Sequence, residues 1–154
     1  MLRQLNEEES AGILQSNSVG RLGCTDGENV YIVPINYQYE KESILCYSLE
    51  GLKIDLMRKN PSVCFEVDEI TDPYNWKCVI INGSFEEITG KAELDILRAR
   101  YSEYFLRKRT TLPAPPASDA EDKEIQEQPY RSSERVFYRI RFSKISGRSD
   151  SGFD

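Results

Sequence analysis

The segment from Tyr47 to Lys53 carries the residues best suited to bind an anion. An apolar run typical of a strand ends at Tyr47, a hydroxyl follows at Ser48, and a short helix is predicted from Gly51, with Lys53 in its first turn. The N–H groups at the start of a helix favour an anion, and Ser48 and Lys53 would add a donor and a positive charge. Since a lysine at this end gains nothing from the helix dipole, a phosphate partner would explain it. A plain strand–helix junction with a solvated lysine is the alternative.

Other chemistry is limited by what the sequence lacks. The 154 residues include no histidine, which excludes catalytic triads, His-ligated zinc or haem and an imidazole base. There is no Walker loop, GxGxxG segment or nucleophile elbow. The adjacent carboxylates at 68–69 and 86–87 would point to opposite sides of a strand, which indicates solvated faces. No catalytic residue is therefore predicted.

The four cysteines favour burial over chemistry. Cys24, Cys46, Cys64 and Cys78 form no CxxC pair, and three of them lie in apolar runs typical of strands. We predict buried thiols in a reducing compartment and no metal site.

Charge and hydropathy indicate a cytoplasmic protein. Residues 1–9 have no apolar signal core, and no apolar run is long enough to span a bilayer, so we expect no membrane partner. The 20 Lys and Arg against 26 Asp and Glu give a formal charge of −6, which argues against broad binding to nucleic acid or anionic lipid.

The elements that must position the 47–53 segment are mainly strands in one domain over 1–154. The clearest strand runs from Tyr31 to Tyr39, with an apolar or aromatic residue at every odd position. Pro34 lies inside it, and its missing N–H must face an edge, a bulge or a ligand. Further strands are predicted over 20–25, 44–47, 63–67, 76–81 with 84–88, and 136–142, and helices over 6–16, 51–60 and 91–108. Asn6 and Glu9 have the spacing of a capping box at the start of the first helix. The remaining segments are a loop over 71–75, a turn or bulge at 82–83, and an acidic, proline-containing loop over 110–128. Short connections between these strands predict a mainly β fold, a six- to seven-stranded antiparallel split barrel with flanking helices.

Several of these segments resemble the FMN-binding split-barrel superfamily in order and spacing. The segments are 19–22, 33–37, 48–54, 58–68 and 79–83, and the similarity covers residues 5–105. The sequence is most similar to the pyridoxamine 5′-phosphate oxidase-like branch that includes the nitroimidazole-resistance proteins. The resemblance implies a homodimer that binds FMN between two barrels.

The resemblance also implies which residues bind the cofactor. The strand with Val33, Pro34, Ile35 and Asn36 would line the isoalloxazine ring. Tyr47 and Ser48 would stand at the ribityl-phosphate end, and Lys53 would bind the phosphate. Trp76 would approach the flavin from the partner subunit.

One departure from the branch bears on activity. Many nitroimidazole-resistance relatives carry a histidine where Tyr47 stands, and a tyrosine cannot carry a proton at neutral pH. The substrate motifs of true pyridoxamine phosphate oxidases are not recognisable near the C-terminus. We therefore predict a flavin-dependent oxidoreductase of unknown substrate, with NAD(P)H or a small electron acceptor as a further partner.

Two alternatives of other classes stay open. The first is a flavin- or haem-binding module for storage or sensing, in which only Tyr or Cys could ligate haem iron. The second is a dimeric interaction protein without a ligand.

Overall fold

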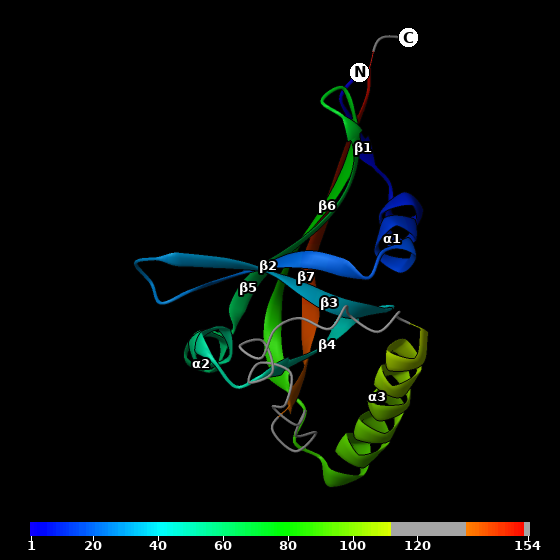
Figure 1. The fold of residues 1–154 in the computed structure, drawn as a ribbon. Helices are drawn as coiled ribbons and strands as arrows, with labels where there is room; N and C mark the ends of the chain where they lie inside the picture. The colour runs from blue at the N-terminus through cyan, green and yellow to red at the C-terminus, as the bar shows by residue number, and fades with distance from the viewer. Residues whose placement is uncertain (112–134, 153–154) are drawn as a thin grey trace, which may run out of the picture. The chain divides into compact units, whose positions relative to one another are not determined.

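The computed structural model describes residues 1–111 and 135–152 (Figure 1). The strands are β1 (Arg3–Leu5), β2 (Val19–Thr25), β3 (Val30–Glu40), β4 (Ser43–Leu49), β5 (Ser62–Asp72), β6 (Asn75–Glu87) and β7 (Arg135–Ser151). The helices are α1 (Glu7–Ser16), α2 (Leu52–Lys59) and α3 (Lys91–Thr111). None of the helices in these ranges is long and apolar enough to cross a membrane.

The strands of the described residues form one seven-stranded sheet that closes on itself. Their order is β1-β7-β4-β3-β2-β5-β6, and a further pairing of β6 with β7 completes a ring of six strands, to which β1 is added at one edge of β7. In Figure 1 the β2–β3 hairpin projects sideways from β5, β6 and β7, three long antiparallel strands that lie alongside one another. The predicted antiparallel split barrel is confirmed.

The barrel interior follows the alternation read from the sequence. Phe65 is fully buried, and the Tyr37 ring meets it edge to face with centroids 5.1 Å apart. The Tyr37 hydroxyl donates to the Leu14 carbonyl at 2.6 Å and so ties α1 to the barrel. The predicted capping box of α1 is present, because Asn6 and Glu9 exchange hydrogen bonds at 2.8 and 2.9 Å.

The turns differ in part from the prediction. The expected loop over 71–75 is mostly strand, since β5 runs to Asp72 and β6 begins at Asn75. The Asp72 carboxylate accepts bonds from the Tyr74 N–H and the Asn75 amide, both at 2.8 Å, so a very short turn suffices. The expected irregularity at Gly83 is a shift in the β6–β7 register, where a side chain would overlap the Arg141 carbonyl.

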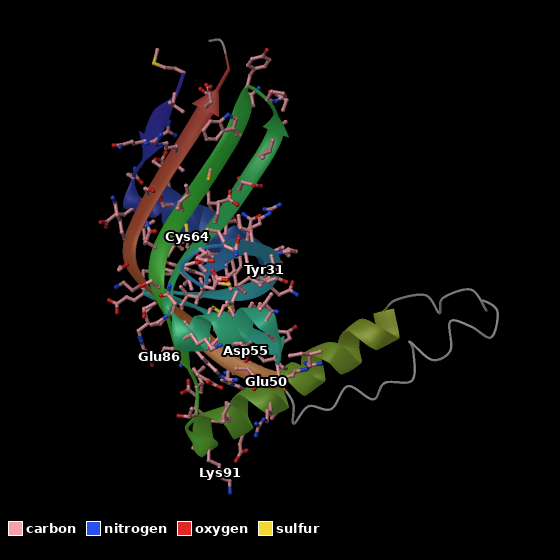
Figure 2. All side chains as sticks on the ribbon, turned by 90° about the vertical axis from the view of Figure 1, so that its left-hand side faces the viewer. Tyr31, Glu50, Asp55, Cys64, Glu86 and Lys91 are labelled. Atoms are coloured by element: carbon pink, nitrogen blue, oxygen red, sulfur yellow. The ribbon has the colours of Figure 1, made fainter. Side chains whose placement is uncertain are left out.

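The cysteine prediction is only half right. Cys24 and Cys46 are buried, but Cys64 is exposed and Cys78 is partly so (Cys64 is labelled in Figure 2). Cys64 alternates with buried Val63 and Phe65, so it points out of the barrel. An apolar run therefore does not establish which face a cysteine occupies.

By contact density the chain divides into two compact units, residues 1–88 with 136–154 and residues 89–135. The helix α3 belongs to the second unit and confirms the helix predicted over 91–108. The predicted acidic loop over 110–128 lies, apart from its first two residues, outside the described residues. The single domain over 1–154 stays a prediction.

Candidate functional site

The first half of β3 has a strand on one side only. It pairs with β2 from Val30 to Asn36, but its pairing with β4 covers Tyr37–Glu40. Within the described residues, β3 and β4 therefore diverge beyond Tyr37. Pro34 lies in the diverging half, where the missing N–H of a proline can be tolerated at an unpaired edge.

The four predicted ring-contacting residues of β3 alternate between two faces. Ile35 is 7% exposed and Val33 is packed against the barrel core, whereas Pro34 and Asn36 are exposed. Tyr31, which the odd-number pattern places with the inward residues, is exposed instead, because this end of the hairpin extends beyond the barrel. Of the four predicted residues, therefore, only Pro34 and Asn36 present exposed side chains to a ligand.

The junction of β4 and α2 follows the point where β4 leaves its pairing with β3, after Cys46. Gly51 is the N-cap of α2 and gives the first-turn N–H groups no side-chain cap. A Cβ atom at Gly51 would meet no other atom within 4 Å, so the space in front of the helix is open. These N–H groups are free to bind an external anion.

Lys53 is half-buried in the first turn of α2, which packs against β2 (Figure 1). Burial raises the pKa of the Cys24 thiol, and the Lys53 charge acts in the opposite direction, which places the ammonium group beside β2. Within the described part of the chain, no ion pair or hydrogen bond involves Lys53. A half-buried cation without a counter-ion is a candidate anion ligand.

Ser48 and Tyr47 are less available than predicted. The Ser48 side chain is 9% exposed, and its hydroxyl donates to the Leu49 carbonyl at 3.0 Å. The Tyr47 ring is half-buried and lies 6.0 Å from the ring of Phe137 in β7. Ser48 could therefore donate to a phosphate only after its hydroxyl turns away from Leu49.

Trp76 lies at the end of the β5–β6 hairpin that is remote from α2. It pairs with Ile70 at one end of this hairpin, while Ser62 at the other end follows α2. Eight residues separate Ser62 from Ile70, which at about 3.3 Å per residue is roughly 26 Å of strand. The approach of Trp76 to a flavin from a second chain stays a prediction.

Enclosed space does not coincide with the predicted site. A cavity of about 380 Å³ is lined by Cys24, Val30 and Cys64 among others, and one of about 840 Å³ lies between α1 and β7. None of the eight predicted residues lines either cavity. The candidate site is thus an unpaired strand edge and a helix N-terminus rather than one of these cavities.

Sequence reasoning missed a charged residue that acts on the junction. Arg58 binds both Glu50, which precedes α2, and Glu87 at the end of β6. The available signal was spacing, since Arg58 follows Gly51 by seven residues, about two helical turns, and so faces the same side.

Comparison with known proteins places these features in a family. The family model described as pyridoxamine 5′-phosphate oxidase matches residues 6–149. An FAD-binding protein of Mesorhizobium loti has a solved structure similar to this chain, with 32% identity, 98% of this chain and 99% of the other covered, and a TM-score of 0.74.

Two further proteins are more distant or matched over a shorter length. A Bacteroides thetaiotaomicron protein, provisionally assigned to 5-nitroimidazole antibiotic resistance, is 18% identical with a TM-score of 0.62, over 98% of this chain and 93% of the other, and shows the fold alone. An uncharacterised protein of Rhizobium meliloti is 34% identical over 87 residues, which are 56% of this chain and 58% of that protein. The match therefore spans less than two thirds of this curated relative.

Proposed function

Because the chain belongs to the pyridoxamine 5′-phosphate oxidase family, we propose that it binds a flavin nucleotide at the junction of β4 and α2. The observation that carries this proposal is Lys53, a half-buried cation with no counter-ion in the part of the chain that the structure describes, beside a helix N-terminus that has no side-chain cap. The FAD-binding relative from Mesorhizobium loti supports the same class of ligand.

The residues present fit the parts of such a ligand. The uncapped N–H groups of α2 and the Lys53 ammonium suit the phosphate, since both favour a compact anion. The unpaired edge of β3 at Pro34 suits a flat ring, because a backbone without an N–H can lie against an aromatic surface. When bound, the flavin would supply hydride or electron transfer, while the protein would orient it and tune its charge environment.

The sequence predicts FMN, whereas the Mesorhizobium loti relative binds FAD. Both nucleotides carry the isoalloxazine ring, the ribityl chain and the first phosphate, which are the parts that the junction can hold. We keep FMN as the smallest ligand that satisfies the site, and the binding experiment below includes both.

We further propose a homodimer in which the second chain covers the unpaired edge of β3. Several large apolar side chains are exposed on the β2–β3 hairpin, among them Val30 at 70% and Ile32 at 65%. Apolar exposure of this extent on one element marks a binding surface rather than a solvated one. Trp76 of a second chain would then approach the flavin. A monomeric mass by light scattering at micromolar concentration would contradict this arrangement.

The absorption spectrum of the purified protein tests the main proposal. Bands near 375 and 450 nm (approximate values for oxidised flavin) are expected, and FMN or FAD should raise the melting temperature of protein from which flavin has been removed. A colourless protein whose melting temperature does not change at high flavin concentration would refute it.

A second measurement separates an enzyme from a binding module. We propose that the bound flavin is reduced during turnover, so NAD(P)H should bleach the visible absorbance and an electron acceptor should restore it. If flavin binds, but no combination of a pyridine nucleotide or chemical reductant with an electron acceptor gives turnover, the module for storage or sensing is the better interpretation.

A further inference from the structure

Arg58, in the last turn of α2, binds two carboxylates from different elements. Its Nη1 and Nη2 atoms each donate to Glu50 at 2.8 Å, and its Nε and Nη2 atoms donate to Glu87 at 3.0 and 2.7 Å. The hydrogen bonds that the guanidinium donates to Glu87 and Glu50 raise its pKa, so it remains charged throughout the working range. Arg58 thus links the residue before α2 to the end of β6.

Two acidic residues lie close in sequence to the start of α2, Glu50 before the N-cap and Asp55 in the first turn. Glu50 stands one residue before the N-cap Gly51, and the first-turn N–H groups behind Gly51 have no side-chain cap (Glu50 is labelled in Figure 2). A free carboxylate at this position can turn towards those N–H groups and is attracted by the positive end of the helix dipole. Such a contact would occupy the groups that an external anion needs.

The ion pair holds Glu50 away from that position. Arg58 lies seven residues beyond Gly51, and at about 1.5 Å per residue its backbone is roughly 10 Å further along the helix. The paired contacts at 2.8 Å hold the Glu50 carboxylate on the guanidinium, and the first-turn N–H groups of α2 donate no hydrogen bond to it.

We propose that Arg58 is a positioning residue for anion binding, which keeps Glu50 off the N-terminus of α2. The first-turn N–H groups and Lys53 are thereby left to the phosphate of the ligand. The inference rests on the proposed function, since that phosphate is taken to be the flavin's. It adds a residue whose role is to prevent the protein from capping its own binding site.

The test compares ligands with and without a phosphate. In Arg58→Gln, released Glu50 competes with the ligand, so the Kd for FMN should rise about fivefold. That factor is the upper end of the usual range for one charge at a helix terminus. The Kd for riboflavin, which has no phosphate, should change less than about twofold. In the double variant Arg58→Gln/Glu50→Gln, Glu87 at the end of β6 still loses its partner, but no carboxylate is released beside the N-cap of α2, and FMN affinity should return to that of the wild type.

A matched control removes an ion pair of the same kind elsewhere. Arg141 of β7 pairs with Glu86 of β6, and Arg141→Gln should leave both Kd values unchanged. Melting temperatures without ligand would show whether each variant folds. Equal losses for FMN and riboflavin in Arg58→Gln, or a double variant no better than the single one, would overturn the positioning role and leave Arg58 as a structural residue.

Inorganic phosphate as a probe separates the two proposals. One outcome would be that flavins do not bind but phosphate raises the wild-type melting temperature, with the rise lost in Arg58→Gln and restored in the double variant. In that case the flavin proposal fails and the role of Arg58 stands. A wild-type protein whose melting temperature changes with neither flavin nor phosphate overturns both.

Discussion

Replacement of Lys53 by glutamine tests the phosphate site most directly. The Lys53 ammonium is half-buried and, within the described residues, has no counter-ion. Two unit charges about 4 Å apart attract each other by ~1 kcal/mol in water and ~4 kcal/mol at the effective dielectric of a protein surface. For a half-buried group we take ~2 kcal/mol, which corresponds to a roughly thirtyfold rise in the Kd for FMN.

The same substitution should leave the free protein nearly unchanged. Because Lys53→Gln breaks no ion pair or hydrogen bond, the free energy of unfolding without ligand should change by less than about 0.5 kcal/mol. Flavin fluorescence titrations with FMN and riboflavin measure the loss, and only FMN affinity should fall.

Lys59→Gln is the matched control, because Lys59 is an exposed lysine at the other end of the same helix. Its Kd values should equal those of the wild type. If Lys53→Gln weakens FMN and riboflavin by the same factor, or leaves FMN binding intact, the phosphate does not lie at Lys53 and the assignment of the site is wrong.

Other positions give independent tests. Gly83→Ala should lower the melting temperature and destabilise the fold by about 2 kcal/mol or more, because the added methyl would overlap a backbone carbonyl of β7 that cannot rotate away. Tyr138→Phe should be neutral or stabilising by about 1 kcal/mol in urea unfolding, since the fully buried Tyr138 hydroxyl makes no hydrogen bond of good geometry among the described atoms and lies beside only the Cys46 thiol, a weak partner. The hydrogen bond from Arg3 lowers the pKa of Glu9 from 4.5 to about 2. The ionised Glu9 therefore stabilises the folded state above pH 4.5, and this contribution is lost as the pH falls towards 2. Glu9→Gln should show a smaller loss of stability than the wild type in that window, measured by urea midpoints. Tyr47→His should alter the pH dependence of flavin reduction more than flavin affinity, because imidazole titrates near neutral pH.

The local elements were predictable where one physical signal decides them. The capping box at Asn6, the alternation around Tyr37 and the irregularity at Gly83 each depend on residues close in sequence, and the structure confirms all three. The outward position of Cys64 was not predictable from its apolar neighbours, because a strand buried on one face and a strand buried on both contain similar runs. Arg58 was missed for a different reason, since its partner Glu87 lies 29 residues away in the sequence, in β6.

The divergence of β3 and β4 explains why one region of this barrel has several unusual features. An unpaired strand edge invites another strand, and proteins normally block it or cover it. Here Pro34 lies along the free half of β3, while Val30 and Ile32 on the same hairpin remain largely exposed. A proline at the edge disfavours pairing with a further strand, and exposed apolar side chains disfavour a surface that is left to solvent. A flat ligand against the edge, with a second chain over the hairpin, would satisfy both, and it would bring the ligand to the helix terminus that Arg58 keeps free.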